Sequence, residues 1–336
     1  MTDYLFRPEV VRVALVVGVV VSVLFYERVQ LTTGGAVVPA YLALSLPAPL
    51  HVLATLLAGF LAYLTVSVVL SRRVIVYGRR KFELEVLAGL VFVALFAGVA
   101  SLVDAIDPRL SGLAALGFLV PGVLAHDMAR QRPGKTVLAV LATTGILGAF
   151  VFLYSALLAI SPLRDSAVPA LASATGYPNE LILPAAAASV LIGMLVFDRL
   201  GLRSGGFISG TYLALVGPRW ADLVFALTVA AATWFLVVRL IMPRLLVFGR
   251  RKLSTMVLVG SLVAWTSEVL VSTLSGGYYL PWRGLPVMAL MVPALIANDA
   301  QRQGWERTLW GTTLTATGVY AVMSLISALA TGVGWL

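Results

Sequence analysis

The sequence predicts an all-α, polytopic membrane protein built from two parallel tandem repeats. The first reason is composition, because 60% of the 336 residues are hydrophobic and 12% are charged, whereas about a quarter of a soluble domain is charged. The second reason is that several polar motifs occur twice in the same order. Together they predict eight long transmembrane helices and four short helices broken by proline or glycine, with 8 to 12 crossings in total.

The long helices are predicted from apolar segments that carry almost no charge. About 20 such residues are needed to cross the hydrocarbon of a bilayer as a helix. The segments are Val10–Tyr26, Leu50–Leu70, Leu84–Val103, Val137–Ile160, Leu181–Phe197, Leu223–Ile241, Met256–Leu274 and Leu309–Leu329. The net charge of +9 is therefore attributed to basic loops between spans, where orientation is set, and no nucleic-acid partner is predicted.

The duplication is read from polar motifs, because leucine and valine coincide by chance in any two membrane segments. The Gly34-Gly35 pair returns 171 positions later, as does the Gly-Arg-Arg-Lys turn, and an Asp-x-x-Arg-Gln motif returns 172 positions later. The chain thus divides into a first repeat at 1–160, a linker at 161–180 and a second repeat at 181–336.

Two short apolar segments interrupt each repeat. They are too short to cross easily and too apolar for ordinary loops. They are Gly34–Pro49, Leu113–Ala125, Gly205–Pro218 and Leu285–Ala297. As re-entrant half-helices they give four crossings per repeat, and as tilted crossings they give six. Charge favours six, because Arg28, the first Gly-Arg-Arg-Lys turn and Arg130–Lys135 then all face the cytoplasm. Either count is even, which predicts parallel repeats.

The broken segments are the first candidate site. Backbone that is irregular at membrane depth must be buried in protein or line an aqueous cavity, and matching broken helices in two halves often mark a binding site. The alternative is that these residues only allow close helix packing. The candidate residues are Gly34, Gly35, Pro39, Tyr41, Pro121, Gly205, Gly206, Tyr212 and Pro293.

Charged and polar motifs give the other candidates. Asp127, Arg130 and Gln131 share a helix face by spacing, as do Asp299, Arg302 and Gln303, which predicts either an interfacial ion pair or a polar face for a charged ligand or a partner. The basic turns Arg79-Arg80-Lys81 and Arg250-Arg251-Lys252 either anchor to anionic lipid or dock an acidic partner or chain.

Acidic residues close the first span of each repeat. Glu27 and Asp198 are each followed at once by arginine. This pattern is typical of a snorkelling helix end, and a proton or cation site is the alternative.

Motifs for catalysis and cofactors are not found in the sequence. Arg132–Thr136 resembles the end of a phosphate-binding loop, but its opening glycine would fall at Ala129. The two histidines, His51 and His126, form no zinc motif, and there is no cysteine. No metal, cofactor or catalytic residue is predicted, and any ATP chemistry is expected from another polypeptide.

The repeated motifs resemble those of the PgsC/CapC family, the membrane subunit of bacterial poly-γ-glutamate synthase. The resemblance lies in Gly35–Leu44, Tyr77–Phe82 and Val292–Gly304, and it implies two fused copies of a one-repeat protein. It further implies a prokaryotic plasma-membrane protein that is not catalytic alone. By this resemblance it anchors a Mur-ligase-like amide ligase, works beside an export subunit and helps pass an anionic polymer.

The two copies are not identical. Ser209-Gly210-Thr211 stands where the first copy has Val38-Pro39-Ala40, which indicates that the copies have diverged in task. Two other functional classes stay open: a secondary transporter with duplicated broken helices, and a membrane scaffold without a substrate path. A ligase gene beside this one favours the synthase, and an aqueous cavity lined by the repeated polar motifs argues against the scaffold.

Overall fold

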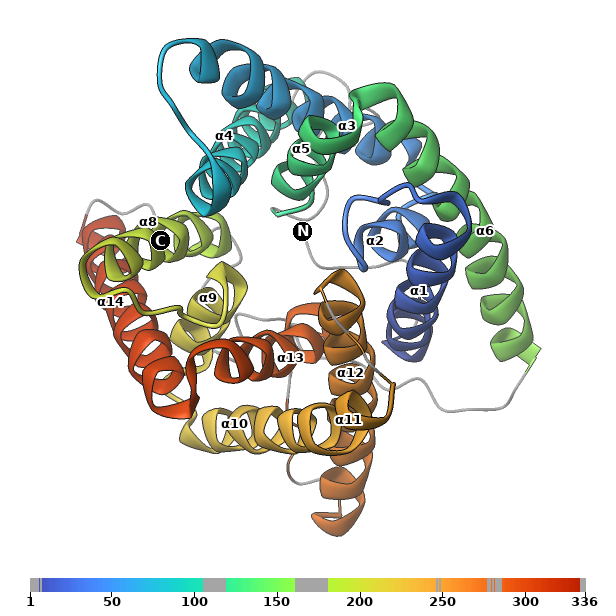
Figure 1. The fold of residues 1–336 in the computed structure, drawn as a ribbon, viewed down its shortest axis with the longest axis vertical. Coiled ribbons are helices and arrows are strands. Elements are labelled where there is room, and N and C mark those ends of the chain that lie inside the picture. The colour runs from blue at the N-terminus through green and yellow to red at the C-terminus, as the bar shows by residue number, and fades with distance from the viewer. Residues whose placement is uncertain are drawn as a thin grey trace. The chain divides into compact units, whose positions relative to one another are not determined.

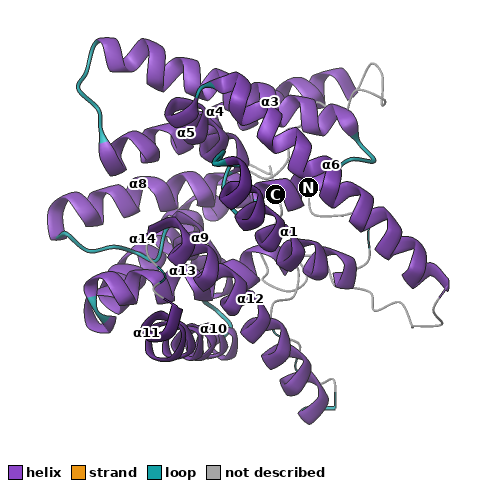
Figure 2. Cartoon of the chain, turned by 45° about the vertical axis from the view of Figure 1, so that its right-hand side comes forward, coloured by secondary structure: helices purple, strands orange, loops and turns teal. Residues whose placement is uncertain are grey.

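All regular structure in the described part of the chain is helical. The computed structural model describes residues 6, 8–104, 119–160, 181–245, 247, 249–276, 279, 281 and 286–332, and none of these lies in a strand (Figures 1 and 2). This confirms the all-α prediction. The chain divides into two compact units, Met1–Ser166 and Ala167–Leu336. The predicted linker 161–180 lies outside the described residues, as does 113–118 of one short segment.

The two units contain the same elements in the same order. Unit 1 has α1 Pro8–Val29, α2 Val38–Leu44, α3 Pro49–Tyr63, the π-helix η1 Leu64–Val69, the short η2 Leu70–Arg72, α4 Gly78–Asp104, α5 Val120–Gln131 and α6 Pro133–Ile160. Unit 2 has α8 Ile182–Leu200, α9 Phe207–Val216, α10 Trp220–Trp234, the π-helix η5 Phe235–Ile241, α11 Met242–Leu245, α12 Gly249–Leu274, α13 Pro286–Gln303 and α14 Trp305–Gly332.

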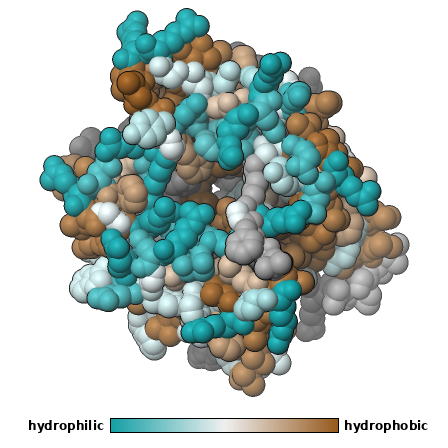
Figure 3. Space-filling view, viewed as in Figure 1, coloured by the Kyte–Doolittle hydropathy of each residue, from teal (hydrophilic) through white to brown (hydrophobic). Residues whose placement is uncertain are grey.

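Eight helical stretches within the described residues are long and apolar enough to cross a membrane. Each overlaps one of the eight predicted segments, so the chain is a multi-pass membrane protein. The spans are Glu9–Val29, Pro49–Arg72, Gly78–Leu102, Pro133–Leu158, Ile182–Leu200, Trp220–Leu245, Arg251–Leu274 and Trp305–Leu329. They expose large apolar side chains, such as Leu138, Leu153 and Leu157 of α6, and the surface over α6 is largely hydrophobic in Figure 3.

The short helices of unit 1 run back along longer ones. Ser22 of α1 donates a hydrogen bond to the Ala36 carbonyl just before α2, and a Cβ added at Gly18 would lie 2.7 Å from the Ala40 Cβ. α2 is therefore antiparallel to α1. With 7 and 12 residues, α2 and α5 rise only about 10 and 18 Å, which is less than the roughly 30 Å of hydrocarbon.

The glycine crossing of α4 and α5 fixes their directions. A Cβ added at Gly122 would lie 2.5 Å from the Val86 Cα, so no side chain fits between the two backbones. One turn further along α5, His126 contacts Phe82, which lies earlier in α4. The helices are thus antiparallel, and the basic start of α4 lies at the same end as Arg130. Unit 2 repeats this crossing with Gly260 against Ala294.

A π-helix interrupts the same span in each unit. Leu64 begins η1, and Phe235, which is 171 positions later, begins η5. Such bulges are rare and frequently occur at functional sites. In unit 1 the bulge presents Ser67 to α4, and in unit 2 it places Arg239 over the ring of Trp234.

Candidate functional site

In unit 1, the end of α5 holds the loop that precedes α2. The Asp127 carboxylate accepts a hydrogen bond from the Gly34 N–H at 2.9 Å. The Gln131 side chain accepts from the Thr32 N–H at 2.7 Å and donates to the Thr32 carbonyl at 2.6 Å, and it also donates to Thr136 at 3.0 Å. We call this arrangement the loop clamp, because two side chains of α5 satisfy backbone groups of the broken segment.

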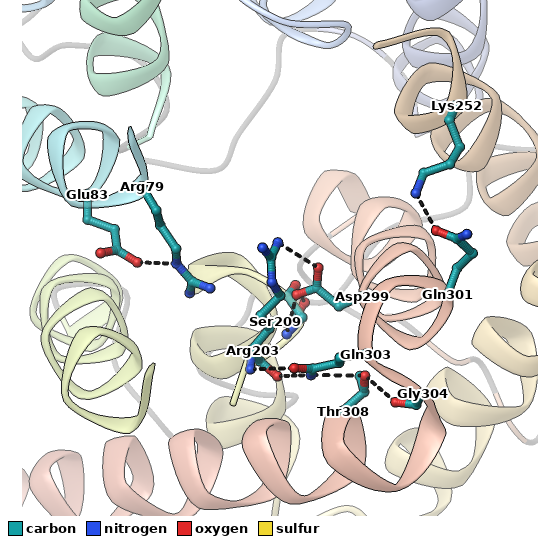
Figure 4. Close-up of polar contacts among 11 residues, drawn as sticks. Arg79, Glu83, Arg203, Ser209, Lys252, Asp299, Gln301, Gln303, Gly304 and Thr308 are labelled. Atoms are coloured by element: carbon teal, nitrogen blue, oxygen red, sulfur yellow. Dashed lines mark hydrogen bonds and ion pairs between the residues drawn. The ribbon is translucent and has the colours of Figure 1, made fainter. Parts of the chain in front are cut away.

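Unit 2 contains the same loop clamp, drawn in Figure 4. Asp299 accepts from the Gly205 N–H at 3.2 Å. Gln303 accepts from the Arg203 N–H at 2.9 Å and donates to the Arg203 carbonyl at 2.8 Å and to Thr308 at 3.1 Å. Every clamp residue has its counterpart in unit 1 at the offset of the duplication, so the repeated sequence motifs are the two halves of one repeated contact.

The backbone of the clamped loops requires glycine. Gly34 and Gly35 have φ values of +75° and +96°, and Gly205 and Gly206 have +71° and +80°, a region that other residues rarely adopt. A Cβ at Gly34 would also lie 2.8 Å from Leu124 of α5. The glycine pairs therefore let the loop lie against α5 or α13, where the clamp side chains satisfy backbone N–H groups of the loop.

The arginines of the two Asp-x-x-Arg-Gln motifs lie outside the clamp. Asp127 and Asp299 are 2% and 8% exposed, whereas Arg130 and Arg302 are exposed. At 100° per residue, the aspartate and glutamine lie about 40° apart and the arginine lies about 60° to the other side. Each motif thus divides into a buried clamp and a cation at the surface of the same helix end.

The basic turn of unit 1 is paired with carboxylates in the first turns of α4. Arg79 contacts Glu83 at 2.6 Å, and Lys81 lies 3.9 Å from Glu85. Glu85 is fully buried and also binds His126 Nδ1 at 2.8 Å and the Ser67 hydroxyl at 2.9 Å. The repeated motifs did not point to this cluster, because unit 2 has Met256, Asn298 and Val238 at the positions of Glu85, His126 and Ser67.

The basic turn of unit 2 has different surroundings. Lys252 is 8% exposed and donates a hydrogen bond to the side-chain carbonyl of Gln301 on α13. Arg203 places a guanidinium nitrogen 4.0 Å from Asp299, and Figure 4 shows Arg203 at the clamp and Lys252 apart from it, on Gln301. In Figure 3 hydrophilic residues gather on the viewed face over α9 and α13.

The remaining predicted residues lie at the helix ends and in the broken segments. Pro39, Pro121, Tyr212 and Pro293 are buried and Tyr41 is half-buried. Glu27 and Asp198 are exposed near the ends of α1 and α8, and Arg80 and Arg251 are exposed in the basic turns. The side chain of Arg250 lies outside the described residues. No group of three or more metal-ligating residues occurs in the part of the chain that the structure describes.

A second polar contact missed from the sequence lies at the start of α10. Asp222 is 2% exposed, pairs with Arg219 at 3.2 Å and accepts a hydrogen bond from the Tyr279 hydroxyl. Burial and the contact with Asp222 raise the pKa of Tyr279. This tyrosine therefore remains a hydrogen-bond donor at neutral pH and fastens its loop to α10.

Comparison with known proteins assigns both halves of the chain to one family. The model of the family described as "Capsule biosynthesis CapC" matches residues 17–137 and again residues 188–309. The chain belongs to the CapC family. The double match agrees with the tandem duplication, and both loop clamps lie inside the matched segments. No solved structure matches the chain.

Two curated relatives of CapC type match one copy. "PGA biosynthesis protein CapC" of Bacillus subtilis (strain 168) is 32% identical over 142 residues, which are 42% of this chain and 93% of the relative. "Capsule biosynthesis protein CapC" of Bacillus anthracis has the same identity and coverage. A chain with two CapC segments is thus about twice as long as these one-copy relatives.

Proposed function

We propose that this CapC-family chain is a membrane subunit for poly-γ-glutamate synthesis, which anchors a separate ATP-dependent amide ligase and helps pass the anionic polymer across the membrane. Membership of the family and the names of the two curated relatives support the synthetic role. The proposal also includes a separate ligase, an export subunit and a path for the polymer.

The gathering of cations around each clamped loop carries the proposal. In unit 1 the contacts place the Gly-Arg-Arg-Lys turn and Arg130 at the end of α5 that clamps the loop following α1. Unit 2 joins the start of α12, the end of α13 and the loop after α8 in the same way. A rigid broken segment beside cations is suited to guiding carboxylates, because arginine grips them through two parallel hydrogen bonds.

Charge reversal tests whether these cations act on the polymer or the ligase. Arg79→Glu plus Arg250→Glu is expected to abolish polymer production in cells, while the purified ligase retains ATP-dependent ligation in solution. Arg79→Lys plus Arg250→Lys preserves charge but loses the bidentate geometry, and it should keep membrane insertion and lose only part of the output.

The comparison must be made at matched expression and insertion. Unchanged polymer yield from a correctly inserted reversed-charge protein would mean that the turns only orient the helices. Affinity purification in mild detergent should recover the ligase with this chain. If the chain alone makes polymer from glutamate and ATP, the claim that a separate ligase is needed fails.

A further inference from the structure

The basic ends of the two units differ in net charge. Nine matching positions surround each clamp and basic turn. In unit 1 they hold four cations and three carboxylates, and in unit 2 they hold five cations and one carboxylate. The unit 1 positions are 32, 79, 80, 81, 83, 85, 126, 127 and 130, and those of unit 2 are 203, 250, 251, 252, 254, 256, 298, 299 and 302. The second copy therefore has the same basic turn but two fewer acids.

Lys252 shows the consequence of this loss. Its counterpart Lys81 reaches the buried carboxylate of Glu85, but position 256 is methionine and the partner of Lys252 is the neutral amide of Gln301. The charged groups that act on Lys252 are Arg302 and Arg203, of the same sign, and Asp299. Burying a cation among like charges is costly unless an anion compensates it.

The lone carboxylate of this cluster is already engaged. Asp299 accepts the Gly205 N–H and lies beside Arg203, so it serves the clamp and one cation. Arg302 is exposed at the end of α13, one residue after Gln301. Arg203, Lys252 and Arg302 therefore bring three cations to the end of α13, where the nine matching positions hold a single carboxylate.

A buried polar group of α13 adds a second feature. Asn298 is 6% exposed, and its side-chain oxygen has no hydrogen-bond partner among the described residues. It lies one turn before Gln301, on the face that meets α12, where unit 1 has the histidine that binds Glu85. An amide-linked polyacid offers both carboxylates for the cations and N–H donors for such an acceptor, whereas a phosphate polymer offers only anions.

We propose that the basic end of unit 2, formed by Arg203, Lys252 and Arg302, binds carboxylate groups of an amide-linked polyanion, whereas the charge at the matching end of unit 1 is largely offset by its own acids. This rests on the proposed function and adds that the two copies divide the work. The burial of Lys252 and the partial burial of Arg203 suit a thin chain with projecting carboxylates better than a broad protein surface.

Matched charge removal in the two units provides the test. The purified full chain is placed in phosphatidylcholine nanodiscs, and binding of a fluorescent γ-glutamate oligomer is followed by anisotropy. Lys252→Gln plus Arg302→Gln is expected to weaken binding about tenfold or more. Lys81→Gln plus Arg130→Gln removes the same two charges from unit 1 and should weaken binding by a clearly smaller factor, because three carboxylates already offset the cations there. Equal losses in the two variants overturn the proposal.

An exchange of one residue tests the neutralisation directly. Ser254→Glu places a carboxylate four residues after Arg250, as Glu83 stands after Arg79, and should weaken binding although no cation is removed. Glu83→Ser in the variant that lacks Lys252 and Arg302 should restore part of the binding through unit 1. Lys252→Arg keeps the charge and should retain binding, which separates loss of charge from misfolding. No effect of Ser254→Glu, in a protein that elutes and melts like the parent, contradicts the proposal.

Further comparisons identify the chemical class of the ligand and show which of the two proposals fails. If polyphosphate or phosphatidylglycerol in the nanodisc displaces the oligomer at equal charge, the site is a general anion site and the carboxylate assignment is wrong. If polymer yield in cells requires the chain but both double variants behave alike, the division between the copies fails and the proposed function stands. If oligomer binding shows the asymmetry and deleting the gene leaves polymer yield unchanged, the proposed function fails and the binding site stands.

Discussion

Removal of Gln131 tests whether the loop clamp determines the stability of unit 1. In Gln131→Ala the Thr32 N–H and carbonyl lose the partners that stand at 2.7 and 2.6 Å. Thr32 is 9% exposed, and each unsatisfied buried group costs about 1–3 kcal/mol. Part of this cost is offset, because the Gln131 side chain no longer has to be ordered, which is worth about 2 kcal/mol, and because water can enter beside Thr32. We expect a net loss of about 2–3 kcal/mol.

The loss is measurable as a thermal shift of the purified chain in detergent. For a unit of this size, about 1 kcal/mol corresponds to about 2–4 °C, so the transition of unit 1 should fall by roughly 4–12 °C. Limited proteolysis should also cut between Thr32 and Gly35 once the clamp is gone. Arg130→Ala is the control, because Arg130 is exposed on the same turn and its loss should cost at most about 0.5 kcal/mol. Equal melting of the two variants refutes the reasoning.

Two further predictions concern packing and orientation. Gly122→Ala forces a methyl group against the Val86 Cα and should lower the free energy of unfolding by about 1–3 kcal/mol. Gly98→Ala is the control and should not lower the melting temperature, because nothing lies within 4 Å of the added methyl group. Equal effects of the two variants would contradict the crossing of α4 and α5. Because the chain has no cysteine, single cysteines at Phe82 and Leu253 report topology. Both should react with an impermeant thiol reagent only after permeabilisation, and labelling of either in intact cells means that the basic turns face outward.

Sequence predicted the long helices well because length and apolarity act locally. Each predicted segment overlaps one observed span and only the ends differ, as where α6 begins at Pro133, four residues before the predicted Val137. In unit 1 the structure also brings the Gly-Arg-Arg-Lys turn and Arg130 to one end, as the charge pattern favours, whereas the number of crossings stays a prediction. Charge patterning carried that information because few cations occur outside the short loops.

The clamp could not be predicted, although its glycine, aspartate and glutamine were each noticed as candidates. Asp127 and Gly34 lie 93 residues apart in sequence, and hydropathy gives no register between them. Two motifs that are duplicated at nearly the same offset can contact each other, but they can equally serve two separate functions. Side-chain geometry decides, because only the aspartate and glutamine lie close enough in angle to reach one loop.

The acidic cluster around Glu85 was missed for the opposite reason. Repetition selects residues that both copies keep, and Glu85, His126 and Ser67 have no counterparts of the same type in unit 2. The signal that could have found them is the contrast between Gly78–Val86 and Gly249–Val257, which begin with the same four residues and then differ by two glutamates. Comparing the copies for differences would have pointed to α4.

Fusion of two copies gives a physical reason for this contrast. In an assembly of two identical one-copy chains, every substitution appears in both, so a carboxylate that neutralises one basic turn neutralises the other. In a tandem chain the acids can be lost from one copy alone. The first copy can then keep a paired, self-sufficient basic turn, while the second exposes its charge to a ligand. The shared clamp preserves the scaffold in both copies, and the positions around it are free to diverge.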